Sequence, residues 1–258
     1  MASKQIIPTA EPFFFSGSRT GILLVHGFTG APKEMRGLGE YLHREHNFSV
    51  LGVRLSGHAT HPEDMIRSSY ADWLASVEDG HAMLSHQADS IIIMGLSMGG
   101  ILALTTASYL PVRGVVAMST PYKLPDDPRL RHIDWLSKIV PYMPKNGGTP
   151  GESWFDKEAF HRHVSYPENP VHAIGELNKL MNEMHNALSH IHVPVCLIHS
   201  RDDHYVWKDS MPRIHEELTA TQDKQMLWIE GSGHVITSDA QRDIVYSTAA
   251  NFVHRIIA

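Results

Sequence analysis

The stretch Gly95-Leu-Ser97-Met-Gly99-Gly100 decides the fold expected for this chain. It directly follows the apolar run 91–94 and opens a segment with helical spacing, 98–110. A strand that turns this sharply into a helix holds its central serine in a strained conformation, so the neighbours at 95 and 99 must be nearly free of side chain. The turn also aims the first free N–H groups of the helix at any anion that forms beside Ser97. The stretch therefore predicts that Ser97 is a nucleophile at the carboxyl end of a strand.

Short apolar or β-branched runs alternate along the chain with segments of helical spacing. Runs that are apolar almost throughout are typical of strands buried on both faces of a parallel sheet. The alternation indicates an α/β fold, with a mostly parallel central sheet and helices on both faces. The expected strands are 21–26, 49–55, 90–94, 114–118, 193–199 and 225–229, and the expected helices are 33–46, 71–86, 98–110, 208–221 and 239–257.

The interval between the strands that end near Thr120 and begin near Val193 breaks this alternation. It is rich in proline and in large apolar side chains, and a structureless loop of about 70 residues is uncommon in a compact domain. We interpret residues 121–190 as an inserted cap (lid) with a return helix over 171–190, and residues 1–120 and 191–258 as the core. Ordinary crossover helices without a gating role are the alternative interpretation.

Composition excludes several classes of protein. The 258 residues hold 22 Lys+Arg against 28 Asp+Glu, a net charge of −6, without a basic run, so a nucleic-acid partner is not expected. The amino terminus lacks the apolar core of a signal peptide, and no window approaches the roughly 18 apolar residues that cross a bilayer. Together with a single cysteine, Cys196, this predicts a cytoplasmic protein. The histidines are scattered without HExxH or paired Cys/His spacing, so no metal site is expected.

A serine hydroxyl is a weak nucleophile at neutral pH, so Ser97 requires a histidine base and a carboxylate that orients it, following in the order Ser, acid, His. Asp202 and Asp203 follow the expected strand 193–199, and His234 follows the expected strand 225–229. These loops leave the carboxyl ends of strands, where open α/β sheets place ligands. Spacing alone does not decide between Asp202 and Asp203.

The stretch His26-Gly-Phe28-Thr-Gly30 ends the first long apolar strand. Its glycines allow the backbone to approach the nucleophile. The N–H groups of Phe28 and Met98 would then form a two-donor oxyanion hole for a tetrahedral intermediate. Without the serine motif, an ordinary strand-to-loop turn would explain the same residues.

Taken together, these motifs resemble the bacterial monoacylglycerol lipases and related carboxylesterases of the α/β-hydrolase superfamily. The resemblance covers nearly the whole chain and is weakest over 121–165. It implies the α/β-hydrolase fold with Ser97 as nucleophile, Asp203 as acid, His234 as base, and Phe28 and Met98 as backbone oxyanion donors. It favours Asp203 because the acid in this family precedes an apolar residue by three positions. The matching stretches are 26–30, 55–58, 63–65, 72–77, 95–100, 201–203 and 232–237.

The implied function is that of a cofactor-free serine ester hydrolase, which cleaves a fatty acyl ester, above all monoacylglycerol, through an acyl-enzyme on Ser97. A short- or medium-chain carboxylesterase and a non-catalytic small-molecule receptor are the alternatives; thioester, lactone or peroxyacid chemistry would use the same residues. Apolar cap residues suggest an acyl channel and a surface that touches lipid aggregates, or simple packing onto the core. The polar contact to the glycerol end has three rival candidates, Glu158, His163 and Glu168.

Overall fold

The computed structural model describes residues 5–145 and 153–258. Within these residues, a seven-stranded sheet has the order β1-β3-β2-β4-β5-β8-β9. Edge strand β1 is antiparallel to β3, and all other neighbours are parallel. The expected mostly parallel α/β architecture is therefore confirmed. The strands are β1 (Phe13–Phe15), β2 (Thr20–Val25), β3 (Ser49–Gly52), β4 (Ser90–Leu96), β5 (Gly114–Met118), β8 (Val195–Ser200) and β9 (Lys224–Ile229).

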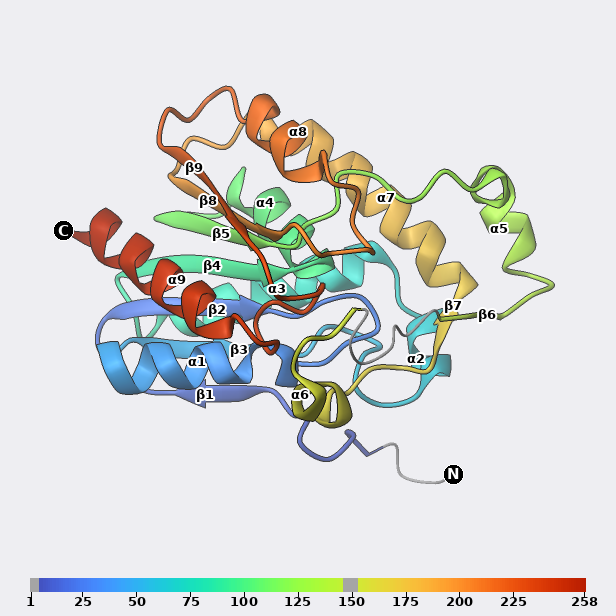
Figure 1. The fold of residues 1–258 in the computed structure, drawn as a ribbon, viewed down its shortest axis with the longest axis horizontal. Helices are drawn as coiled ribbons and strands as arrows, with labels where there is room; N and C mark the ends of the chain where they lie inside the picture. The colour runs from blue at the N-terminus through green and yellow to red at the C-terminus, as the bar shows by residue number, and fades with distance from the viewer. Residues whose placement is uncertain (1–4, 146–152) are drawn as a thin grey trace.

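Helices cover both faces of the sheet (Figure 1). On one face lie α1 (Lys33–His46) and α9 (Arg242–Ile257), and on the other lie α3 (Tyr70–Ser85), α4 (Met98–Ala107), α7 (Val171–Leu188) and α8 (Ser210–Glu217). Successive strand residues serve opposite faces: Ile91 packs with the α4 layer, whereas Ile92 packs with the α1 layer. Because side chains alternate along a strand, burial on both faces requires the unbroken apolar runs seen in the sequence.

Several expected boundaries agree with the structure, and others need correction. The helix 33–46 and the strand 114–118 have the expected bounds. Strand β3 ends at Gly52 rather than at 55, because the chain leaves the sheet there for the loop that leads to α2 (Pro62–Ile66). Strand β9 is not buried on both faces, since it lies at the sheet edge and its residues Gln225 and Met226 are exposed.

Between β5 and β8 the chain runs through short elements before it returns along α7. They are the 3₁₀ helix η1 (Pro128–His132), α5 (Ile133–Leu136), β6 (Tyr142–Pro144), α6 (Lys157–Arg162) and β7 (Glu168–Pro170). Strands β6 and β7 pair antiparallel, and with α5 they lie at one end of the molecule in Figure 1. Helix α7 packs closely on α4 and contributes Leu180 and Met184 to the core. The return helix is thus part of the main helical layer.

No helix within 5–145 or 153–258 combines the length and the apolar character that crossing a membrane requires.

Candidate active site

Ser97 occupies the turn between β4 and α4 with a positive φ of 56° and a ψ of −118°. The strain of such a backbone costs about 1–3 kcal/mol, so the surroundings must hold it in place. The Ser97 N–H donates to the Met118 carbonyl at 2.8 Å. A Cβ at Gly95 would lie 1.9 Å from the Gly99 carbonyl oxygen, and one at Gly99 would lie 2.1 Å from that of Val25. The expectation that positions 95 and 99 need glycine is therefore confirmed.

Three side chains predicted from separate loops meet in one hydrogen-bonded chain. The Ser97 hydroxyl lies 2.9 Å from His234 Nε2, and His234 Nδ1 lies 2.7 Å from Asp203 Oδ2. The other carboxylate oxygen of Asp203 accepts the N–H groups of Tyr205 at 2.8 Å and Val206 at 3.1 Å. The Asp203 side chain is almost fully buried. The arrangement places a hydroxyl, an imidazole and an oriented carboxylate in the sequence that nucleophilic catalysis requires.

Asp202, the rival of Asp203, points elsewhere. Its Oδ2 accepts the N–H of Gly231 at 2.7 Å, and its own N–H donates to Ser200 Oγ at 3.1 Å. These bonds tie the loop after β8 to the loop after β9. The structure therefore gives Asp202 a bond to the backbone and Asp203 the contact with His234.

The electrostatic surroundings of Asp203 and His234 favour the charged form of both side chains. Burial disfavours the Asp203 carboxylate, but the charge and hydrogen bond of His234 outweigh it, so the pKa of Asp203 lies below its ordinary value. Burial likewise disfavours the imidazolium of His234, yet the charge and hydrogen bond of Asp203 hold the pKa of His234 above its ordinary value. A raised histidine pKa strengthens the base that would accept a proton from Ser97.

The turn 26–30 lies beside the strand-to-helix turn that carries Ser97, which we call the elbow. A Cβ at Gly27 would lie 3.4 Å from the Ser97 Cβ, and the Phe28 ring packs edge-on against Trp73 with ring centroids 6.3 Å apart. In the described part of the chain, neither the Phe28 N–H nor the Met98 N–H has a hydrogen-bond acceptor. Met98 is the first residue of α4, where N–H groups lack intrahelical partners. Both groups are thus available to an external acceptor.

A polar cluster, which we define as the buried Glu34 and the partly buried Lys145 and His163, adjoins this turn. His163 Nε2 lies 3.6 Å from Glu34 Oε1, and Lys145 Nζ donates to Thr29 Oγ1 at 2.8 Å and to Ser165 Oγ at 3.0 Å. Burial raises the pKa of Glu34 to about 7 and lowers the pKa of Lys145. Burial and the charge of Lys145 lower the pKa of His163 to about 3, so this imidazole is neutral.

Burial distinguishes the three candidates for the polar contact with the glycerol end of the substrate. Glu158 and Glu168 are exposed to solvent, whereas only 18% of the His163 side chain is exposed and it faces Glu34. Glu34 and Lys145 carried no signal in the sequence, because one lies within a regular helical pattern and the other is a lone lysine.

Asp239, which follows His234 by five residues, joins its loop to the inserted segment. The carboxylate is fully buried. It accepts four main-chain N–H groups, those of Phe155 (2.9 Å), Asp156 (2.6 Å), Gly233 (2.6 Å) and Ala240 (2.8 Å). A Cβ at Gly233 would lie 1.8 Å from the Ser153 carbonyl oxygen. The segment that begins at Ser153 thus packs directly against the residue that precedes His234.

Replacing Asp239 with alanine should destabilise the protein strongly. Four main-chain donors, the buried one of Gly233 and three partly buried ones, would lose their acceptor, and a buried unsatisfied donor costs about 1–3 kcal/mol. We expect the free energy of unfolding to fall by more than about 3 kcal/mol in urea titrations at pH 7. Asp243→Ala is the matched control, because Asp243 is exposed in the first turn of α9 and should cost less than about 1 kcal/mol. Equal losses in both variants would contradict this role of Asp239.

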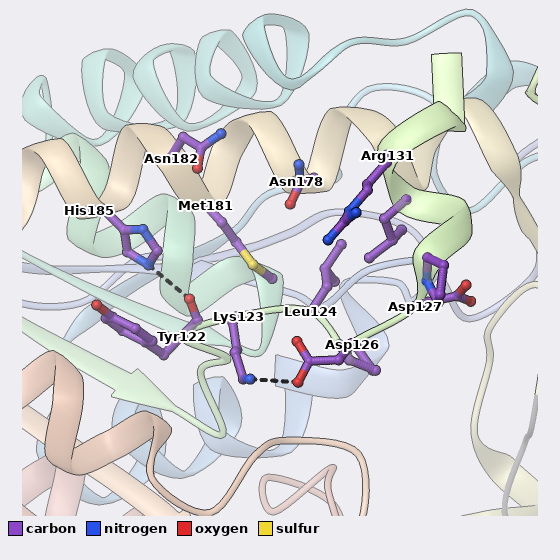
Figure 2. A pocket seen from close by; sticks show the side chains of 13 residues that line it. Tyr122, Lys123, Leu124, Asp126, Asp127, Arg131, Asn178, Met181, Asn182 and His185 are labelled. Carbon is purple, nitrogen blue, oxygen red and sulfur yellow. Dashed lines mark hydrogen bonds and ion pairs between the residues drawn. The ribbon is translucent and has the colours of Figure 1, made fainter. Parts of the chain in front are cut away.

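A cavity of about 490 Å³ lies between residues 122–131 and α7 (Figure 2). On its 122–131 side Lys123 pairs with Asp126 at 2.9 Å, and His185 Nε2 of α7 donates to the Tyr122 carbonyl at 2.8 Å. Its lining includes none of the residues of the hydrogen-bonded chain described above. The cavity is therefore separate from Ser97.

Across residues 5–145 and 153–258, no three His, Cys, Asp or Glu side chains are grouped so that they could hold a metal ion.

The chain is similar to known proteins over nearly its whole length. A family model described as serine aminopeptidase, S33 matches residues 17–241. The chain is 30% identical to a carboxylesterase of Bacillus subtilis (strain 168), with 97% of this chain and 98% of that protein aligned. It is 31% identical to a thermostable monoacylglycerol lipase of Bacillus sp. (strain H-257), with 96% and 95% aligned.

Solved structures show the same fold. One from work on LipS and LipT, two metagenome-derived lipolytic enzymes, matches with a TM-score of 0.89 and 30% identity over 97% of this chain and all of the other. The monoacylglycerol lipase of Paleococcus ferrophilus matches with a TM-score of 0.79 over 93% of this chain and 96% of that one. Its sequence is only 20% identical, so it supports the fold alone. The α/β-hydrolase fold expected from the sequence is confirmed.

Proposed function

Because this chain belongs to the family described as serine aminopeptidase, S33, which places it among the serine hydrolases, we propose that it hydrolyses carboxylic esters with Ser97 as the nucleophile. His234 is the general base, Asp203 orients it, and the N–H groups of Phe28 and Met98 bind the oxyanion. The observation that carries this proposal is the hydrogen-bonded chain from Ser97 through His234 to Asp203, with bonds of 2.9 and 2.7 Å.

In the first half of the reaction, Ser97 Oγ attacks the acyl carbonyl carbon while His234 Nε2 accepts the hydroxyl proton. The carbonyl oxygen becomes an anion, which the two main-chain donors stabilise. His234 then gives the proton to the departing alcohol oxygen, and an acyl-enzyme remains. In the second half, water attacks the acyl carbon, His234 accepts its proton and returns it to Ser97, and the carboxylic acid leaves.

We propose a fatty acyl ester of glycerol, monoacylglycerol, as the substrate. Both relatives with about 30% identity, a carboxylesterase and a monoacylglycerol lipase, have names that state ester chemistry. The polar cluster beside the Gly27 turn offers hydrogen-bonding groups at a buried position, as a hydroxyl-bearing alcohol requires. Among its members, we assign the contact with the glycerol end to His163. Short- or medium-chain esters of simple alcohols are the second choice.

Exposed apolar side chains in the segment between β5 and β8 support the proposal that the protein contacts lipid aggregates. Trp135 and Ile139 are 63% and 60% exposed and stand four residues apart, and neighbouring exposed apolar side chains are typical of a surface that contacts protein or lipid. Trp135 lies on α5 and Ile139 three residues after its end, and α5 lies at the same end of the molecule as the β6–β7 pair (Figure 1). We propose that this end touches micelles or membranes that supply the substrate, as peripheral contact rather than insertion.

Rates on monoacylglycerol and on the methyl ester of the same fatty acid test the substrate. We expect kcat/KM to be at least about 10-fold higher for monoacylglycerol, because one hydrogen bond to a glycerol hydroxyl contributes about 1.5 kcal/mol. His163→Ala should remove this preference by raising KM for monoacylglycerol and should leave the methyl ester unchanged. His161→Ala, an exposed neighbour, is the matched control.

Two outcomes would contradict the proposal. Equal rates on both esters in the unaltered protein would favour the simple carboxylesterase. Faster hydrolysis of amino acid nitroanilides than of any ester would instead assign aminopeptidase activity, in accordance with the family description.

A further inference from the structure

Glu34 is a buried carboxyl group that the proposed reaction does not use. It lies in the first turn of α1, and only 6% of its side chain is exposed. Burying a carboxylate is costly unless it is paired or hydrogen-bonded, so its position calls for an explanation. Its Oε2 accepts the N–H of Gly27 at 2.9 Å. Gly27 directly precedes Phe28, the proposed oxyanion donor, and a Cβ at Gly30 would lie 2.3 Å from Glu34 Oε1. The carboxylate therefore fills the inside of the 27–30 turn.

The main chain of Glu34 holds a second part of the site. Its carbonyl oxygen accepts the Thr237 hydroxyl at 2.7 Å and the Ser238 hydroxyl at 3.4 Å. Thr237 follows His234 by three residues, and its own carbonyl accepts the Tyr246 hydroxyl at 2.7 Å. One residue thus bonds both to the turn that carries Phe28 and to the loop that carries His234.

We propose that Glu34 is a positioning residue for the proposed hydrolysis, which holds the Gly27–Phe28 turn through its carboxylate and ties that turn, through its main-chain carbonyl, to the loop that carries His234. This inference rests on the proposed function. A donor turn that is already held in place needs no reorganisation when the oxyanion forms, which is the condition for efficient electrostatic stabilisation. The carbonyl bonds of Glu34 to the His234 loop keep this turn at a constant place relative to the base.

The charged groups around Glu34 make its effect depend on pH. Facing it are Lys145 from the segment after β6, His163 from the end of α6 and His234 from the loop after β9, while Lys33 precedes it on α1. Burial raises the pKa of Glu34 to about 7, against the opposing effects of the Gly27 N–H, Lys145 and His234. Its charge in turn helps to raise the pKa of His234. As the pH falls through 7, Glu34 binds a proton, and its charge no longer acts on His234.

The experiment compares Glu34→Gln and Glu34→Ala with the unaltered protein on a nitrophenyl ester between pH 5 and 9. The nitrophenol leaving group has no aliphatic hydroxyl, so recognition of glycerol cannot contribute. Glutamine keeps an acceptor for the Gly27 N–H but loses the charge, whereas alanine loses both. Glu40→Gln is the matched control, because Glu40 lies on the same helix, is 37% exposed and pairs with Arg44.

For Glu34→Gln we expect the midpoint of the acid limb of kcat/KM to move to lower pH, because the charge that helps to raise the pKa of His234 is lost. The plateau above pH 8 should fall by less than about 10-fold. For Glu34→Ala, kcat should fall by about 100-fold, within the range found for loss of an oxyanion donor, with KM within about threefold. Glu40→Gln should keep the original profile.

A stability measurement checks the ionisation independently of activity. Because burial raises the pKa of Glu34 from 4.5 in the unfolded chain to about 7, its contribution to stability is complete below about 4.5 and is lost as the pH rises through about 7. Glu34→Gln should therefore raise the urea midpoint relative to the unaltered protein more at pH 8 than at pH 5. A constant difference between the two pH values would overturn the proposed ionisation.

Two further results would overturn the role of Glu34. One is an unchanged pH profile in Glu34→Gln together with full kcat in Glu34→Ala. The other is a loss confined to KM for glycerol esters, which would make Glu34 a substrate-binding residue. Failure of the proposed function looks different: the unaltered protein would then show neither ester turnover nor labelling of Ser97 by a serine-directed phosphonate.

Discussion

Replacing Ser97 with alanine is expected to lower kcat for every ester by a factor on the order of 10⁵–10⁶, the scale known for loss of a serine nucleophile. The hydroxyl is the only group of the hydrogen-bonded chain that can form the acyl-enzyme, and His234 Nε2 would face a methyl group. Folding should be preserved, because alanine meets the same positive φ of 56° as serine does. Steady-state rates and urea unfolding of the variant measure both effects.

Ser119→Ala provides the matched control for this loss. Ser119 also has a positive φ, 45°, and its buried hydroxyl makes no hydrogen bond within the described residues. It lies just beyond the end of β5, beside the strand that leads to Ser97. We expect Ser119→Ala to keep activity within about threefold, since no partner is lost. Substantial turnover in Ser97→Ala would show that another residue is the nucleophile.

Replacing Asp203 with asparagine should lower kcat by a factor on the order of 10³–10⁴. Oδ1 of Asp203 accepts the N–H groups of Tyr205 and Val206, so the amide oxygen of asparagine would take that place. The NH₂ group would then face His234 Nδ1, and Nδ1 would have to accept its hydrogen bond. The proton of the imidazole would move to Nε2, where it blocks acceptance of the serine proton. Loss of the carboxylate charge should also shift the kinetic midpoint of His234 to lower pH.

Asp202→Asn is the control with the same chemistry one residue away. Asp202 contacts the Gly231 N–H instead of His234, so we expect a loss of less than about 10-fold, from weaker support of the loop. Rates for the two asparagine variants at pH 8, together with their urea midpoints, separate catalytic from structural losses. If the losses were reversed, the orienting acid would be Asp202.

Local determinants explain why much of the fold could be predicted. The elbow around Ser97 depends on close backbone approaches at Gly95 and Gly99, and both are encoded within six residues. The alternation of strands and helices follows from apolar runs that serve two packed faces. By contrast, β1 is three residues long at an antiparallel edge, so no periodicity could develop there. The exposure of Gln225 and Met226 depends on the edge position of β9, which its own residues do not encode.

The residues of the candidate site also include some that the sequence could predict and others that it could not. His234 and the Asp202–Asp203 pair could be found because each follows an apolar strand, and parallel strands bring their carboxyl ends to one edge. Glu34 and Asp239 had no comparable signal. Each is an acidic residue at the start of a helix or in a loop, where most carboxylates are solvated. Only their burial and their bonds to backbone N–H groups distinguish them.

By itself the sequence determined the α/β class, the elbow at Ser97 and the chain order of serine, acid and histidine, because these depend on spacing and on the backbone freedom of neighbouring residues. The tertiary structure decided that Asp203 rather than Asp202 meets His234, that His163 rather than Glu158 or Glu168 lies inside, and that Glu34 is buried against the 27–30 turn. The physical reason is that desolvation and hydrogen-bond direction are set by segments distant in sequence that meet only in the folded chain.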